Sequence, residues 1–157
     1  MTKIYIDVSP SLSSQLDEKT LNIIISEFIK YKEDGGKEDL PVPTVRIQKK
    51  FKSANPQFGR DRYDTAYKSV DIQHLHLMDS NAKWDSGGGL LAQWHCTSDT
   101  HLIYSYFKHA QNYYFYLVEI YSIDAHQSYL KAQNILINEV TKFKEEKLQQ
   151  LESSKSA

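Results

Sequence analysis

Apolar residues recur near the start of the chain at spacings that predict a strand and then a helix. Residues 3–8 alternate and are rich in β-branched side chains, which is typical of a strand. In the helix that follows, Asp17 is the predicted N-cap, Leu16 and Leu21 form a hydrophobic staple, and Gly35 is the stop. The buried face of this helix consists of apolar residues at helical spacing: Leu21, Ile24, Ile25, Phe28 and Ile29.

From residue 36 to about residue 71 the periodicity is lost, and three prolines, Pro41, Pro43 and Pro56, exclude a long helix. This irregular stretch carries a cluster of basic residues with aromatic residues between them. Its members are Arg46, Lys49, Lys50, Lys52, Arg60 and Arg62, with Phe51, Phe58 and Tyr63. Positive charge beside stacking surfaces favours RNA binding, although such a run is also typical of an ordinary solvated face.

Residues 70–77 alternate again and predict a second strand. Because successive side chains of a strand point to opposite faces, His74 and His76 share one face and Leu75 and Leu77 share the other. If the leucines enter the core, both imidazoles should lie on the open face of the sheet.

The connection over residues 78–100 is centred on Gly87-Gly88-Gly89, between Trp84 and Trp94. It lacks the G-K-[ST] ending of a phosphate-binding P-loop, so we interpret it as a flexible excursion. The clearest strands follow at residues 101–107 and 113–122, and the five residues between them predict a hairpin loop.

A long helix is predicted from about Ala125, with an apolar stripe of Tyr129, Leu136, Val140 and Phe143. Asp124 has the chemistry of an N-cap, and Gln127 stands where a capping box needs it. His126 then lies in the first helical turn, where free N–H groups and the helix dipole attract phosphate and disfavour imidazolium. A neutral imidazole at this position could take part in acid–base chemistry on a phosphodiester, although an ordinary histidine at a helix start would give the same pattern.

These elements predict an α+β fold: a strand, a helix, an irregular basic segment and an antiparallel meander closed by a helix. A length of 157 residues fits one domain, which we place at residues 1–150, with residues 151–157 as a frayed tail.

Composition narrows the class of protein further. Hydrophobic content of 40% and charged content of 25% are typical of a globular chain, and no apolar run approaches the roughly 20 residues of a membrane span. We expect a cytoplasmic protein without membrane contact, since the start of the chain does not read as a signal peptide. The single cysteine, Cys96, excludes an internal disulfide, and a net charge of -1 confines any RNA contact to a local patch.

Several short segments, taken in order, resemble YafO-type toxins of bacterial toxin–antitoxin pairs, within the RelE-like group of small ribonucleases. They are Phe28-Ile29-x-Tyr31-Lys32-x-Asp34-Gly35, Phe58-Gly59-Arg60-Asp61 with Tyr63-Asp64, His74-Leu75-His76-Leu77, Thr97-Ser98-Asp99 with His101-Leu102-Ile103-Tyr104, and His126. The resemblance covers roughly residues 16–130 and implies a RelE-like antiparallel sheet with an N-terminal and a C-terminal helix. It also implies an mRNA endonuclease that acts at the translating ribosome and is neutralised by a cognate antitoxin.

Metal-independent RNA cleavage uses the neighbouring 2′-hydroxyl as nucleophile, and the enzyme supplies proton transfer and positive charge. His126 is our first candidate for proton transfer and Arg60 for the charge, because a guanidinium can bind two phosphate oxygens. A salt bridge from Arg60 to Asp61 or Asp64 is the alternative. Further candidates are His74 or His76 as a second proton-transfer group, Tyr104 as a phosphate or base contact, and Lys49, Lys50, Lys52, Arg62 and Tyr106 for RNA binding.

Two other classes of function remain open. One is a non-catalytic module that binds RNA or a protein through the basic and aromatic face. The other is a metal-dependent enzyme that uses His74-x-His76 with His95, Cys96 or His101 as ligands. The spacing around His95-Cys96 matches no closed zinc motif, so we expect no metal and no cofactor. Cys96 is expected to be a buried or incidental thiol. The oligomeric state, the base preference and the identity of the antitoxin stay open.

Overall fold

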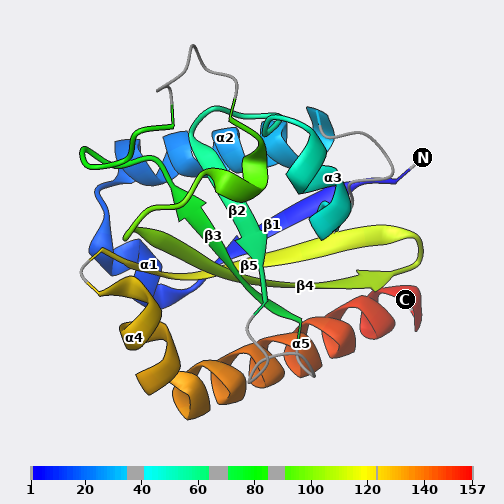
Figure 1. Ribbon diagram of the computed structural model, residues 1–157. Coiled ribbons are helices and arrows are strands. Elements are labelled where there is room, and N and C mark those ends of the chain that lie inside the picture. Colours follow the sequence, from blue (N-terminus) through cyan, green and yellow to red (C-terminus); the bar gives the residue numbers. More distant parts are fainter. Residues whose placement is uncertain (1, 35–40, 64–70, 85–90, 123, 157) are drawn as a thin grey trace.

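The computed structural model (Figure 1) describes residues 2–34, 41–63, 71–84, 91–122 and 124–156. In chain order its elements are β1 (Ile4–Val8), α1 (Pro10–Gln15), α2 (Glu18–Asp34), α3 (Val45–Lys50), β2 (Phe58–Arg62), β3 (Ile72–Leu77), the 3-10 helix η3 (Gln93–His95), β4 (His101–His109), β5 (Asn112–Tyr121), α4 (Ala125–Lys131) and α5 (Gln133–Ser156).

A five-stranded sheet in the order β1-β5-β4-β3-β2 forms the centre of the fold. The pairs from β2 to β5 are antiparallel, whereas β1 runs parallel to β5, so the sheet is mixed. Helices α1 and α2 cover one face, where Leu12 and Phe28 pack on the strands, and α4 and α5 cover the other (Figure 1). The predicted α+β class, with helices at both ends of the chain, is confirmed.

The first strand and the cap of α2 form as the sequence predicts. Asp17 accepts a hydrogen bond from the Thr20 amide at 2.7 Å, and this bond lowers the pKa of the Asp17 carboxyl. Of the predicted helix face, Phe28 is fully buried and Leu21, Ile24 and Ile25 pack against the same cluster. The predicted stop at Gly35 lies outside the described residues. The short helix α1 was not predicted, although Ser9 caps it by accepting from Leu12 N at 3.0 Å.

The irregular stretch contains two elements that the loss of periodicity concealed. Thr44 caps α3 by accepting from the Ile47 amide at 3.2 Å. The edge strand β2 then lies against the η3 segment, with Arg60 N donating to Cys96 O at 2.9 Å. Gly59 permits this approach, because a Cβ there would collide with the Cys96 carbonyl and the Trp84 ring. Strand β2 therefore forms this edge of the sheet, and the segment around η3 and Cys96 covers it.

The hairpin between β4 and β5 is tighter than predicted. The expected five-residue loop is wrong, because His109 and Asn112 already pair and only Ala110 and Gln111 lie between the strands. Their φ angles of 49° and 68° place both residues in the left-handed region, as a two-residue type I′ turn requires.

The C-terminal region forms two helices instead of the single helix predicted. The break falls between Lys131 and Gln133, and the expected tail, residues 151–157, is helical through Ser156. The predicted apolar stripe is confirmed: Tyr129, Leu136 and Val140 are buried, and Phe143 stacks on Tyr116 with ring centroids 3.9 Å apart. This packing places α4 and α5 over the histidine-bearing face of β3.

Candidate active site

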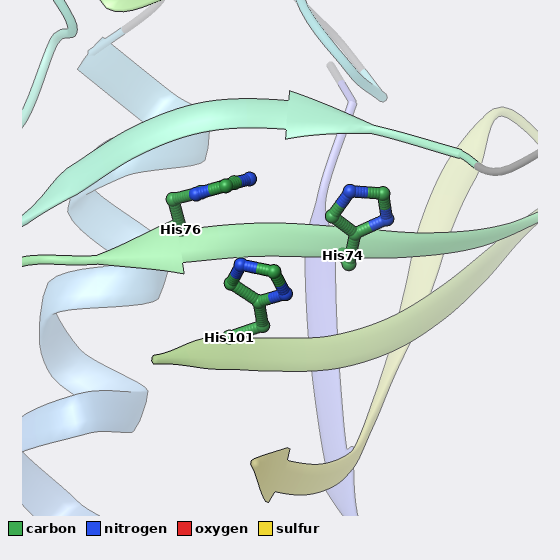
Figure 2. Close-up of side chains that lie close together, drawn as sticks. All are labelled: His74, His76 and His101. Carbon is green, nitrogen blue, oxygen red and sulfur yellow. The ribbon is translucent and has the colours of Figure 1, made fainter. Parts of the chain in front are cut away.

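Three histidines from two neighbouring strands meet on the α4 side of the sheet. His74 and His76 come from β3 and His101 from β4, and Figure 2 shows their rings gathered over these strands. His76 pairs directly with His101 in the strand register. The ring centroids of His76 and His101 are 4.0 Å apart, and those of His74 and His101 are 5.2 Å apart.

The expectation that this face is open to solvent is wrong. Only 3% of His74 and 7% of His76 is exposed. Helix α4 covers them, since the Tyr129 ring lies 5.1 Å from the His74 ring. Alternation correctly separated the histidines from the leucines, but both faces of the sheet are buried.

Burial changes the chemistry of these imidazoles. Loss of hydration is the main cause that lowers the pKa of His74 to about 2, and the repulsion that a protonated His74 would feel from a protonated His101 is the next. Burial likewise lowers the pKa of His76 to about 3, with contributions from His101 and Arg60, and lowers the pKa of His101. All three rings are therefore neutral at pH 7, and they are weak proton carriers there because efficient acid–base catalysis needs a pKa near the working pH.

The backbone of Ser98 fixes the protonation pattern of two of these rings. Its amide donates to His76 Nδ1 at 2.8 Å, so the proton of the neutral His76 ring lies on Nε2. Its carbonyl lies 3.0 Å from His101 Nε2, and because a carbonyl only accepts, His101 carries its proton on Nε2 and a lone pair on Nδ1.

His126 lies in the first turn of α4, as predicted, and is exposed. Its ring lies 6.3 Å from the His74 ring, so it joins the histidine group at the surface. The predicted cap is wrong, however, because Asp124 has a φ of 47° and its side chain makes no capping bond. Asp99 caps the helix instead, accepting from Asp124 N and Ala125 N at 3.0 Å each. That carboxylate occupies two of the N–H groups and adds a negative charge, which weakens the expected attraction of phosphate to this helix start.

Arg60 is positioned by Trp94 and not by an acidic neighbour. Its Nε donates to the Trp94 carbonyl at 2.7 Å, and its guanidinium lies 4.3 Å above the Trp94 ring. Asp61, one of the two carboxylates considered as its partner, is buried on the other face of the sheet, and Asp64 lies outside the described residues. Within the described residues the two terminal nitrogens of Arg60 have no partner, which leaves them for an anion.

The predicted basic residues gather around the same tryptophan. Lys49 Nζ lies 5.7 Å and the Arg62 guanidinium 5.8 Å from the Trp94 ring. Arg62 also pairs with His74 in the strand register, which connects this basic patch to the histidines. Lys50, at the end of α3, and Lys52 are exposed.

The predicted tyrosines do not join this site. Tyr104 is fully buried under α2, where its hydroxyl donates to Asp61 at 2.8 Å. Tyr106 is partly buried on the same face, and burial raises its pKa to about 12. The sheet separates both from the histidines, so a contact of Tyr104 with RNA in this fold is excluded by its burial.

Two residues of the metal alternative lie apart from the histidine cluster. His95 is exposed at the end of η3, and Cys96 is buried with its Sγ 3.5 Å from the Ala92 carbonyl. Among the described residues, the group of potential metal ligands consists of His74, His76 and His101.

Trp94, Ser98 and Asp99 are the residues whose roles the sequence did not reveal. A large aromatic residue within a mostly polar connection could have identified Trp94 as a residue that packs against another segment, which here is Arg60. Ser98 and Asp99 belong to the Thr97-Ser98-Asp99 segment, but their roles depend on backbone atoms and on a contact across 26 residues. No local pattern identifies such contacts.

Imidazole and guanidinium groups thus lie side by side where β2 pairs with β3, and a guanidinium is able to bind two phosphate oxygens at once. The sequence matches the family described as Toxin YafO, type II toxin-antitoxin system, over residues 30–146. This match spans well over half of the chain, so the protein belongs to that family of toxins. The match contains every site residue named above, and it supports an antitoxin as the partner.

No curated protein and no solved structure matches the chain. No helix within the described residues is long and apolar enough to cross a membrane.

Proposed function

We propose that this toxin is a ribosome-dependent mRNA endonuclease that uses the 2′-hydroxyl of its substrate as nucleophile and needs no metal for this chemistry. The observation that carries the proposal is that His126 and Arg62 both lie beside His74, while Arg60 and Arg62 both lie over the Trp94 ring. Membership of a toxin family supports it, because a toxin needs a cellular target and an anion-binding surface suits mRNA.

In this mechanism the 2′ oxygen attacks the adjacent phosphorus and the bond to the 5′ oxygen breaks. His126 exchanges one proton with the RNA, either removing it from the 2′-hydroxyl or supplying it to the departing 5′ oxygen, and solvent serves the other position. Arg60 binds the phosphate oxygens as negative charge grows. His74 and His76 were further candidates for proton transfer, but their low pKa values make them poor proton carriers at pH 7.

Replacing Arg60 with lysine is expected to impair cleavage although the charge is kept. A lysine ammonium cannot bind two phosphate oxygens in one plane, and it would also lose the stacking on Trp94. Loss of charge-assisted bonds worth about 1.5–3 kcal/mol should slow cleavage on the order of 10- to 100-fold. Rates of mRNA cleavage on purified ribosomes would measure this.

Arg46→Lys is the control for nonspecific attraction: Arg46 is an exposed member of the basic cluster on α3, and the change again replaces a guanidinium with an ammonium. Because lysine keeps the charge, this variant should cut mRNA at the parental rate. Parental activity in Arg60→Lys would mean that Arg60 contributes only its charge and makes no specific two-oxygen contact with the phosphate. The phosphate contact would then have to come from Lys49, Lys50 or Lys52.

Cleavage should survive thorough chelation of the toxin when the ribosomes' own magnesium is restored separately. The nucleophile belongs to the RNA, so no metal-activated water is needed. Sequencing of the RNA ends should find 2′,3′-cyclic or 3′ phosphates and free 5′ hydroxyls. Products with 5′ phosphates would show that water was the nucleophile and would contradict the proposed mechanism.

A further inference from the structure

The buried histidines form a group that the cleavage mechanism does not use. One nitrogen from each of His74, His76 and His101 lies within 4.8 Å of the others, on two adjacent strands. All three side chains project into the same space (Figure 2). Strands hold the backbone of such a group rigidly, so the sheet sets where the three side chains start, and only rotation of the side chains moves the rings relative to one another.

Two of the nitrogens are buried without a hydrogen-bond partner in the part of the chain that the structure describes: His74 Nδ1 and His101 Nδ1. On His101 this nitrogen bears the lone pair, because Nε2 donates to the Ser98 carbonyl. Unsatisfied polar atoms are rare inside proteins and call for an explanation such as a bound water or ion. A ligating histidine typically donates its second ring N–H to a backbone carbonyl, as His101 does here.

We propose that His74, His76 and His101 bind one zinc ion. Neutral imidazoles are among the ligands that zinc prefers, and three histidines with an open fourth position are an established zinc arrangement. This differs from the sequence-based expectation of no metal, which rested on spacing and could not show that His101 pairs with His76. The proposal is independent of the cleavage mechanism, because it concerns binding alone.

The geometry requires only a small closure of the rings. Zinc–nitrogen bonds of about 2.0–2.1 Å at tetrahedral angles place ligand nitrogens about 3.3 Å apart. The present separations of up to 4.8 Å therefore close by at most about 1.5 Å, which side-chain rotation can supply.

His76 is the ligand that changes most on binding. Its Nδ1 accepts from the Ser98 amide, so coordination through Nε2 requires the ring proton to move to Nδ1 and that amide to turn away. His74 and His101 bind without such a rearrangement. They are therefore the better positions at which to test the site.

The surrounding charges oppose one another. Arg60 and Arg62 lie on the β2 side and disfavour a cation, as their effect on His76 shows. The negative charges of Asp99 and Asp79 favour a positive charge at His101, and they would likewise favour a cation bound there. Three neutral imidazoles do not offset the two positive charges of zinc, so the bound ion is repelled by Arg60 and Arg62. An anion bound to these arginines would reduce that repulsion and make zinc binding more favourable.

The experiment titrates the tag-free, metal-stripped toxin with zinc in the absence of RNA, by calorimetry, with cobalt(II) absorption as a second readout of the ligand set. We expect one zinc per chain and a visible cobalt spectrum typical of tetrahedral coordination. His101→Gln and His74→Gln should each weaken zinc binding by at least about 100-fold, since even loss of an outer-shell partner costs about 10- to 100-fold. Circular dichroism would show whether these variants are folded. If one of the two does not fold, the other still tests the site.

His109→Gln is the control, because His109 lies at the other end of β4 and its ring contacts Glu152 at 2.9 Å. This variant should bind zinc like the parent. The proposal is overturned if the parent binds no zinc, if both ligand variants bind it as tightly as the parent, or if His109→Gln removes binding. None of these outcomes depends on RNA cleavage, so the proposed function is tested separately.

Discussion

Cells that express the His126→Ala variant are expected to grow normally, because the variant should lose mRNA cleavage while keeping its fold. His126 is exposed at the start of α4, so removing its ring leaves no cavity in the core. The loss of one proton-transfer group should lower the cleavage rate on the order of 10²–10⁴-fold. Controlled expression followed by mapping of mRNA ends would report growth inhibition, cleavage and site preference together.

Gln127→Ala is the matched control, since Gln127 is also exposed and follows His126 in the same helical turn. It should retain growth inhibition. If folded His126→Ala, judged by an unchanged melting transition, cuts mRNA at the parental rate, His126 is not catalytic. The rival interpretation, a non-catalytic module that binds RNA or protein through the basic face, would then be preferred.

The histidine-bearing strand shows what alternation can and cannot predict. A period of two placed His74 and His76 on one face and Leu75 on the other, and the packing confirms this: Leu75 lies in the cluster with Phe28, whereas His74 lies against Tyr129 and beside His76. Alternation cannot show whether a distant helix covers the polar face. Burial lowers the pKa of these histidines, and the neutral rings can then be accommodated inside the protein. A strand that is buried on both faces can therefore still show an alternating polar and apolar sequence.

Strand β2 was missed for a different reason. Three of its five residues are charged, and local propensity does not favour a strand there. Its stability comes from distant bonds, such as the one from Gln93 Nε2 to the Gly59 carbonyl at 2.9 Å. The position of Arg60 therefore depended on a contact with Trp94, 34 residues further along the chain.

His126 illustrates a prediction that held while its reason failed. The sequence correctly placed a helix start just before it. The cap comes from Asp99, which is remote in sequence, because Asp124 adopts a left-handed conformation. A capping pattern identifies a helix boundary more reliably than it identifies the group that binds the free N–H groups.

The side-chain direction of β2 is set by an ion pair on the far face of the sheet. Asp61 lies between Arg60 and Arg62, and its buried carboxylate accepts from Lys32 Nζ at 3.1 Å and from Tyr104 OH at 2.8 Å. Successive side chains of a regular strand alternate, so holding Asp61 under α2 directs Arg62, which pairs with His74, to the face with the histidines. The register is irregular between Phe58 and Asp61, and Arg60 is placed near His76 by that local geometry together with its bond to Trp94. Burial, followed by the Asp61 charge, raises the pKa of Tyr104 well above its usual value, so the phenol keeps its proton to donate.

Replacing Lys32 with methionine should therefore destabilise the whole fold and disturb the arginine-bearing strand. The side chains of Lys32 and Asp61 are 1% and 0% exposed, and removing one partner leaves the other charge uncompensated. Such a change typically costs about 3–5 kcal/mol of unfolding free energy, which urea titration would measure. Lys30→Met is the control: Lys30 is 60% exposed on the same helix and pairs with Glu27 at 3.7 Å, so its loss should cost less than about 1 kcal/mol. Equal small losses in both variants would mean that the buried pair does not hold β2 in place.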